Sequence, residues 1–336
     1  MKPKKDLGKT SIQRPSETSP LRVGVIGVGY LGKFHAEKYS KAPDVRLVGV
    51  VDKDSSRAAA VAEAVDTQAL TDYRDLIGKV DAVSVVVPTY AHFEVSREFL
   101  ENGIHLLIEK PITAQLEEAE GLIRLAEKKG CIIQVGHLER FNPAVVALKD
   151  IVRMPRFIES HRLSTYKNRG TDVSVVLDLM IHDIDIILNL VESKISNIHA
   201  AGIPVISEHV DIANARLEFA NGCVANVTAS RISMKNERKI RLFQKDAYIS
   251  VDFANNEITI VQPEESSSDS LIPGMAINKR CFTKADALDD EIKSFVQAVH
   301  RRQPPEVTGI MGRDALQVAL IIMDQIQHTS AKLHHS

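Results

Sequence analysis

The chain has 336 residues, of which 44% are hydrophobic and 26% are charged, and its formal net charge is −2. This length has room for two ordinary domains, and the near-zero charge gives no reason to expect nucleic acid or a membrane surface as a partner. Three scattered cysteines without metal-ligand spacing indicate reduced thiols in a cytoplasmic protein.

Residues 1–20 are polar and lack the apolar core of a signal peptide, so we expect a disordered tail there. From residue 21 to about 135, Val- and Ile-rich runs of strand length alternate with helical segments. Such alternation predicts a parallel sheet covered by helices on both faces. We therefore expect residues 21–140 to form a Rossmann-like domain.

The first predicted strand, LRVGVIG, runs directly into GVGYLG, and Asp52 follows twenty residues after the last glycine. A strand, this turn, a helix, a second strand and an acidic residue form the dinucleotide-binding fingerprint. Asp52 can accept hydrogen bonds from ribose hydroxyls and would repel a 2′-phosphate, so we expect NAD rather than NADP. The alternative is a glycine-rich turn without a ligand. The residues expected to hold NAD here are Gly27, Gly29, Tyr30, Leu31, Gly32 and Asp52.

Two further strand ends carry polar side chains, in VVVPTYAH and IHLLIEKPIT. Ligands of open α/β sheets bind at the carboxyl ends of the strands, so both segments are expected to face the cofactor. In the first, Thr89 could bind a ribose or phosphate oxygen after Pro88, and His92 could close over the nicotinamide. A turn with helix-capping groups is the alternative for His92.

In the second segment, Glu109 and Lys110 are expected at the nicotinamide end of NAD. A partly desolvated lysine can accept the proton of a substrate hydroxyl as a hydride leaves the alcohol carbon. The alternative is a surface lysine at the end of a strand.

The pattern changes after residue 140, and residues 141–336 are expected to form an α+β domain that binds the substrate and mediates oligomerisation. Asn142-Pro143 predicts a helix start, and Asn221-Gly222 predicts a hairpin. Successive strands with short turns indicate a mostly antiparallel sheet. Two closing helices, near 289–302 and 313–327, could pack back on the first domain. Apolar residues on both alternating sets of the strands predict an interface between copies of the chain; examples are Val210, Ile212, Ala213, Ala215, Val224, Ala225 and Val227.

Within this domain, the segment 173–191 predicts one long helix with a polar stripe. Short polar side chains recur on one face at spacings of four, four, three and four, and long charged side chains are missing from it. The stripe is therefore expected to line a cleft, with Asp178 orienting or charging His182. A plain amphipathic helix is the alternative. A metal site on this single helix would lack a second cluster of ligands, so no metal is expected. The stripe comprises Ser174, Asp178, His182, Asp185 and Asn189.

Three basic residues near this helix in sequence, Arg140, Lys167 and Arg169, could meet an anionic substrate such as a sugar nucleotide, as could Asp178 and His182. For Lys167 and Arg169 a solvated loop is the alternative.

Taken together, GVGYLG, PTYAH, EKPIT and DLMIH resemble, in order and spacing, the Gfo/Idh/MocA family of NAD(P)-dependent oxidoreductases. The resemblance extends from Leu21 to the last helix. It implies a catalytic group of Lys110, Asp178 and His182, and a cis peptide before Pro111. It also implies a large, open antiparallel sheet in the C-terminal domain, through which homodimers or homotetramers assemble.

A finer resemblance rests on VGHLERFNPA and TDVSVVLDLMIHDIDIIL. These segments are similar to the branch that contains UDP-N-acetylglucosamine 3-dehydrogenases, which oxidise the 3-hydroxyl to a ketone for lipid A or surface-polysaccharide synthesis. The alternatives are an inositol or free-sugar dehydrogenase of the same family, and a non-catalytic dinucleotide-binding sensor or scaffold.

Overall fold

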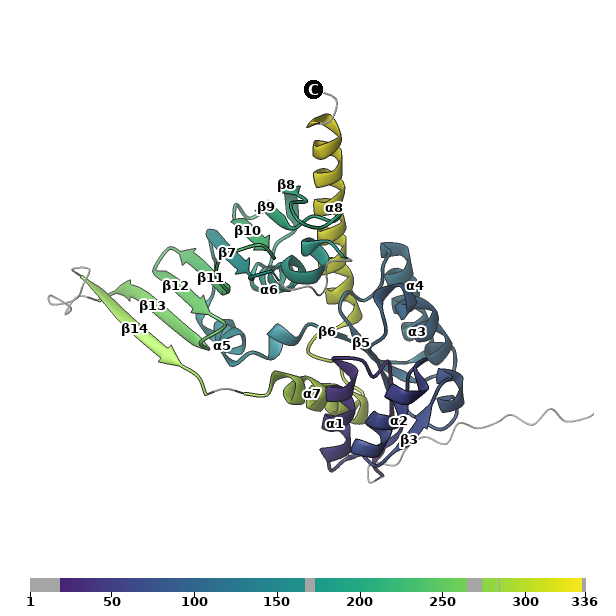
Figure 1. The fold of residues 1–336 in the computed structure, drawn as a ribbon. Helices are drawn as coiled ribbons and strands as arrows, with labels where there is room; N and C mark the ends of the chain where they lie inside the picture. The colour runs from purple at the N-terminus through teal and green to yellow at the C-terminus, as the bar shows by residue number, and fades with distance from the viewer. Residues whose placement is uncertain (1–18, 167–172, 265–273, 284, 334–336) are drawn as a thin grey trace, which may run out of the picture.

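The computed structural model describes residues 19–166, 173–264, 274–283 and 285–333. Lys167, Arg169 and nearly all of the expected tail lie outside these residues. The described chain forms two domains, each built on one sheet (Figure 1). No helix among the described residues is long and apolar enough to cross a bilayer.

The first domain has a six-stranded parallel sheet in the order β3-β2-β1-β4-β5-β6, as expected for a Rossmann fold. The strand order reverses between β1 and β4, so their carboxyl ends border a crevice. The strands are β1 (Leu21–Ile26), β2 (Val45–Val51), β3 (Gln68–Leu70), β4 (Ala82–Val85), β5 (His105–Glu109) and β6 (Ile133–Gly136). The helices are α1 (Gly32–Lys41), α2 (Ser55–Ala64), α3 (His92–Glu101) and α4 (Leu116–Lys129), with short 3-10 turns η1 (Tyr73–Leu76), η2 (Thr89–Ala91) and η3 (Leu138–Phe141).

Local sequence explains where these helices begin and end. Asp54 caps α2 by accepting hydrogen bonds from the Ser56 and Arg57 amides. Helix α4 starts with a reciprocal capping box and ends at Gly130, whose φ of 66° suits a left-handed cap.

The second domain contains an eight-stranded sheet in the order β14-β13-β12-β11-β7-β10-β9-β8. Neighbouring strands are antiparallel except β7 and β10, which are parallel. The mixed, mostly antiparallel sheet confirms the predicted fold class. The strands are β7 (Phe157–Leu163), β8 (Ile195–Ile203), β9 (Ile212–Phe219), β10 (Val224–Ser230), β11 (Glu237–Gln244), β12 (Ala247–Asp252), β13 (Glu257–Pro263) and β14 (Met275–Cys281).

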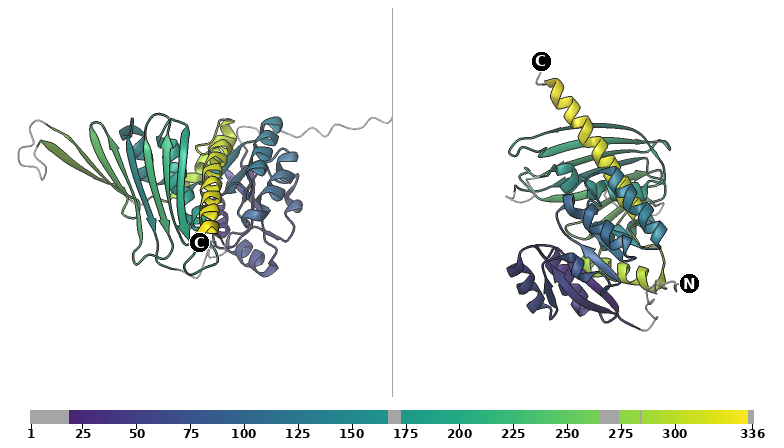
Figure 2. Two further views of the ribbon diagram at one scale, coloured as in Figure 1. Left: turned by 90° about the horizontal axis from the view of Figure 1, so that it is seen from above. Right: turned by 90° about the vertical axis from the view of Figure 1, so that its right-hand side faces the viewer.

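In the described chain, helices cover one face of this sheet, the face toward the first domain (Figure 2). They are α5 (Pro143–Ile151), α6 (Ile181–Leu190) and α8 (Gly309–Leu333), and Asn142 caps α5 as its sequence predicts. Helix α7 (Ala287–Arg301) instead returns to the first domain, where Phe295 packs in the same core as Val23 and Tyr39. The two domains are thus joined by segments that are distant in sequence.

The apolar residues on the two alternating sets of the strands have different surroundings. Ala213, Ala215, Ala225 and Val227 are buried on the helix-covered side, so an interface on this sheet would use the other face. On the uncovered face, an apolar row crosses six neighbouring strands near one end, and polar residues fill the next row toward the middle of the sheet. This apolar row, as we call it below, consists of Val224, Phe157, Phe243, Tyr248, Val261 and Ile277.

Candidate functional site

The glycine-rich turn has the backbone geometry that its motif predicts. Gly27 has a φ of +85°, and a Cβ there would lie 2.6 Å from the Val86 carbonyl oxygen. A Cβ on Gly32 would lie 1.8 Å from the Gly27 carbonyl oxygen, so only glycine lets α1 begin here. A Cβ on Gly29 would meet no atom within 4 Å. The turn therefore leaves open space at the start of α1, where a pyrophosphate fits.

Asp52 lies at the carboxyl end of β2 beside this turn. Its carboxylate accepts hydrogen bonds from the backbone amides of Val28 (3.1 Å) and Asp54 (3.0 Å). The Arg57 guanidinium also lies 3.2 Å from it, a partner that the sequence pattern did not indicate. Asp52 is thus held in place where the fingerprint puts a ribose, next to a cation.

The strand ends that were expected to face the cofactor come together. They border one cleft of about 310 Å³ with Tyr30 and Leu31 of the glycine-rich turn. Tyr30 and Leu31 are well exposed at its edge. The cleft is lined by Tyr30, Leu31, Val86, Val87, Pro88, Thr89, His92, Glu109 and Lys110.

His92 is placed differently from the expectation that it closes over the nicotinamide. Its side chain is buried, with Nδ1 2.9 Å from the Pro111 carbonyl oxygen and Nε2 2.8 Å from that of Val87. Burial lowers the pKa of His92 although both carbonyls favour a proton. The ring therefore joins the ends of β4 and β5, and its polar atoms are occupied by the backbone.

Lys110 follows β5 and is joined to Pro111 by a cis peptide bond, as the resemblance implies. Its Nζ donates a hydrogen bond of 2.7 Å to the Asp178 carbonyl oxygen and lies 3.6 Å from the Asp178 carboxylate. Burial lowers the pKa of Lys110, and the charges of Asp178 and Glu109 oppose this shift only in part. A buried amine with a lowered pKa releases its proton more readily than an exposed lysine, which suits it to proton exchange.

The helix that carries Asp178 is not a regular α-helix. Val176–Met180 forms a π turn that continues into α6, and such wide turns often occur at functional sites. Three residues of the expected polar stripe, Asp178, His182 and Asp185, meet residues of the first domain, but their contacts differ from those predicted. Asp178 meets Lys110, and the Nδ1 atom of His182 is buried without a hydrogen-bond partner among the described residues. The expectation that Asp178 orients His182 is therefore wrong in this structure.

A second histidine, His137, lies beside His182 at the end of β6. The two rings are perpendicular, with centroids 6.4 Å apart. Both nitrogens of His137 are buried without hydrogen-bond partners among the described residues. Burial lowers the pKa of both rings, and the charge of Lys110 adds to the effect on each. Both imidazoles are thus neutral at pH 7, and sequence reasoning missed His137 because no helical or strand periodicity marks it.

Arg140 does not reach a substrate position in the structure. Its guanidinium is buried, 3.6 Å from Asp185 and 3.7 Å from Glu306. The expectation that it binds an anionic substrate is therefore not supported, because carboxylates from α6 and from the segment before α8 surround its charge.

A buried ion network under the site was also missed. Arg162 on β7 binds Asp183 at 2.7 Å and Glu139 at 2.9 Å. Asp183 is the polar residue of α6 that departs from the stripe, and Arg162 is a charged residue on the inward face of a strand. Those two irregularities were the only signal in the sequence, and only the tertiary structure shows that Asp183 and Arg162 form an ion pair.

Residues 21–137 match the family model described as "Oxidoreductase family, NAD-binding Rossmann fold", and residues 151–250 match the "GFO/IDH/MocA C-terminal domain". The chain belongs to the Gfo/Idh/MocA family of oxidoreductases. It is 39% identical over 301 residues to the UDP-N-acetylglucosamine 3-dehydrogenase of Acidithiobacillus ferrooxidans, which covers 89% of this chain and 95% of that protein.

A solved structure and a more distant relative agree with this family assignment. A solved structure of the Acidithiobacillus enzyme superposes with a TM-score of 0.88 at 38% identity, covering 92% of this chain and 98% of that one. The scyllo-inositol 2-dehydrogenase (NAD(+)) of Bacillus subtilis is 27% identical, covering 89% of this chain and 92% of that protein. The chain is thus an NAD-binding oxidoreductase whose relatives act on hydroxyl groups.

Asp52 generates a prediction about cofactor choice in this Gfo/Idh/MocA protein. Asp52→Ala should narrow the preference for NAD over NADP by roughly ten- to a hundredfold, because it removes a repulsive carboxylate and frees Arg57 to pair with a 2′-phosphate. Fluorescence titration with both cofactors measures the two dissociation constants.

The matched control is Asp54→Asn, which removes another carboxylate near Arg57 but keeps an oxygen that can cap α2. An equal change in both variants, or NADP binding as tight as NAD in the unaltered protein, would contradict the role of Asp52.

Proposed function

We propose that the protein oxidises a secondary hydroxyl of a nucleotide sugar, most specifically the 3-hydroxyl of UDP-N-acetylglucosamine to a ketone. The observation that carries this proposal is the 39% identity to a UDP-N-acetylglucosamine 3-dehydrogenase across nearly the full length of both chains. Inositol dehydrogenases matched over 88–89% of the chain share 25–27% identity, and those with 29–32% identity match only 53–65% of it. The three cysteines form no disulfide, which agrees with a cytoplasmic enzyme that supplies lipid A or surface-polysaccharide synthesis.

The site supplies the groups that such an oxidation needs. NAD accepts a hydride when it is bound, and the chain must remove the hydroxyl proton. Lys110 is proposed as the proton acceptor, since burial lowers the pKa of its amine at the end of β5. Asp178 stabilises the ammonium form after the transfer, because its carboxylate lies 3.6 Å from Nζ. His182 is proposed to hydrogen-bond the substrate, since its buried Nδ1 has no partner in the described chain.

A substrate panel tests the proposed function. UDP-N-acetylglucosamine, other nucleotide sugars, free sugars and inositols are each incubated with NAD while NADH absorbance is followed. We expect turnover with UDP-N-acetylglucosamine at a kcat/KM at least about a hundredfold above those of inositols and free sugars, in the range set by polar-group discrimination. Preferential oxidation of an inositol would replace the proposed substrate.

Lys110 gives the second test. Lys110→Met should lower kcat by roughly a hundred- to ten-thousandfold with little change in NAD affinity, as expected for loss of a general base. In the unaltered enzyme the rate of oxidation should rise with pH as the amine loses its proton. The plateau should be reached below pH 10.5, the ordinary lysine pKa, because burial lowers the pKa of Lys110.

Asp178→Asn is a control for which the direction of the shift in the pH profile can be predicted. The Asp178 charge raises the pKa of Lys110, so its removal should move the rising limb of the pH profile to lower pH. A limb that stays in place or moves upward would show that Lys110 is not the group being titrated.

His182 gives a separate prediction. His182→Asn should lower kcat at least about tenfold while NAD affinity stays near that of the unaltered enzyme, since the imidazole is proposed to contact substrate and not cofactor. Stopped-flow hydride transfer and NAD titration measure the two quantities. Asn189→Ala, on the same helix about two turns further along, serves as the control. Turnover close to normal in His182→Asn would favour an ordinary amphipathic helix.

We also propose that the uncovered face of the eight-stranded sheet joins copies of the chain. The apolar row lies beside ion pairs such as Arg241–Glu159 (3.4 Å), and apolar side chains next to polar ones suit an interface. Phe243→Asp should shift the protein from oligomer to monomer in sedimentation velocity at micromolar concentration. Met234→Asp, at a residue that is 98% exposed, should leave the oligomer intact. A monomeric unaltered protein would overturn the proposal.

A further inference from the structure

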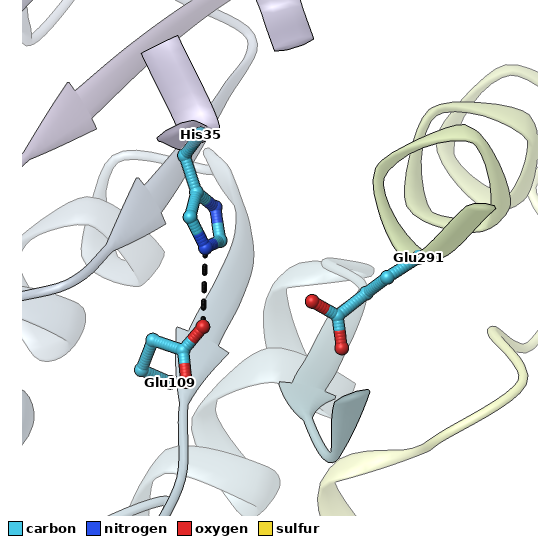
Figure 3. A group of neighbouring side chains, drawn as sticks. All are labelled: His35, Glu109 and Glu291. Carbon is cyan, nitrogen blue, oxygen red and sulfur yellow. Dashed lines mark hydrogen bonds and ion pairs between the residues drawn. The ribbon is translucent and has the colours of Figure 1, made fainter. Parts of the chain in front are cut away.

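Three ionisable side chains from separate elements meet behind the cleft. His35 comes from α1, Glu109 from the end of β5 and Glu291 from α7, and one polar atom of each lies within 4.8 Å of the others. Figure 3 shows the Glu291 carboxyl group directed toward the His35–Glu109 pair. His35 and Glu291 are completely buried. The mechanism proposed above gives Glu291 no role.

Two members of this group are satisfied by their neighbours. The His35 Nε2 atom lies 3.1 Å from the Glu109 carboxylate, and the other ring nitrogen lies 3.3 Å from the Ser84 hydroxyl. Glu109 also accepts a hydrogen bond of 3.3 Å from the backbone amide of Lys110. Burial alone would raise the pKa of Glu109, but His35 and the charge of Lys110 outweigh it and leave the pKa below its usual value. Glu109 is therefore the ionised member.

Glu291 is in the opposite situation. Neither of its carboxylate oxygens has a hydrogen-bond partner among the described residues, and none of the ion pairs between those residues includes it. The groups that face it are His35 and Tyr39 from α1 and Glu109 from β5, while Gln134 on β6 bonds only its backbone carbonyl. An ionised carboxylate in such a place is strongly disfavoured.

The remaining element packed against α7 offers Glu291 no cation. The charged residues of η3 pair elsewhere, Glu139 with Arg162 and Arg140 with Asp185. Burial, together with the charge of Glu109, raises the pKa of Glu291 well above its usual value.

We propose that Glu291 is a neutral, protonated acid at pH 7 that directs its proton toward the Glu109 carboxylate, and that this acid pair positions Lys110. With Glu291 protonated, the acid pair carries a single negative charge, which lies on Glu109 next to Lys110. Glu109 in turn holds the Lys110 backbone amide. Glu291 is then a positioning residue for the proton acceptor, a role that rests on the proposed function, whereas its protonation does not.

A divalent cation on His35, Glu109 and Glu291 is the competing arrangement. It is less favoured because both ring nitrogens of His35 are already used, one by the Glu109 carboxylate and one by the Ser84 hydroxyl. A cation would also require Glu291 to be ionised. The two arrangements therefore predict different pH dependences of stability.

The first experiment measures the unfolding free energy of the unaltered protein and of Glu291→Gln from pH 5 to 8 by chemical denaturation. A carboxyl whose pKa is raised on folding contributes stability that is complete below its unfolded pKa of about 4.5 and is lost as pH rises toward the folded pKa. The folding equilibrium constant of the unaltered protein, relative to Glu291→Gln, should thus fall as pH rises above 5, by up to about tenfold per pH unit until the folded pKa is reached. The control Glu127→Gln, at an exposed position of α4, should show no such relative change.

If the stability of the unaltered protein, relative to that of Glu291→Gln, stays level or rises with pH, the proposal is overturned. Stoichiometric metal in elemental analysis of the purified protein, lost in Glu291→Gln, would do so as well and would establish the cation. Infrared spectroscopy gives an independent reading: the folded protein at pH 7 should show a protonated carboxyl band that Glu291→Gln removes and Glu127→Gln keeps. Absence of that band would contradict a neutral Glu291.

The positioning role is tested with the substrate that the panel identifies. Glu291→Gln keeps a donor for Glu109 and should retain kcat within about threefold, whereas Glu291→Leu should lower kcat at least about tenfold with the KM for NAD unchanged, within the range of general-base effects. Equal kcat in the two variants would overturn positioning, while protonation is judged by the stability and infrared measurements alone. If no substrate is turned over, the proposed function fails and those two measurements still decide the state of Glu291.

Discussion

The contact between Lys110 and Asp178 is the constraint on which the arrangement of the two domains depends. The amine leaves the end of β5 in the first domain and is buried against the second, where the Asp178 carbonyl oxygen accepts its hydrogen bond at 2.7 Å. A buried ammonium group is stable only with such partners. The domains must therefore approach each other closely enough to satisfy it, and the same closure gives the amine its lowered pKa.

Charges on both sides of this contact are arranged in pairs. On the first-domain side, His35 and Glu109 lie behind Lys110, and on the second-domain side Arg162 binds Asp183 and Glu139. Pairing leaves few isolated charges near the cleft. Two imidazoles, His137 and His182, have buried nitrogens without hydrogen-bond partners among the described residues, and burial lowers the pKa values of both. An environment of this kind keeps Lys110 as the main proton-exchanging group of the site.

Local patterns predicted the elements well where one segment decides its own structure. The turn at Gly27, the helix start at Asn142 and the hairpin at Gly222 all formed as expected, because each depends on backbone preferences of a few adjacent residues. The polar stripe from Ser174 to Asn189 was also recognisable, although the π turn within it was not. Nothing in the local sequence marks that extra residue in a turn.

The sequence by itself determined the two-domain plan, the dinucleotide-binding turn and the set of polar residues that reach the cleft. Only the tertiary structure decided which of them pair: Asp178 meets Lys110 and not His182, Arg140 meets Asp185, and the ring of His92 is occupied by backbone carbonyls. The reason is physical. Turns and caps depend on neighbours along the chain, whereas a buried charge selects whichever partner the packed elements bring within reach, and for Lys110 that partner is 68 residues away.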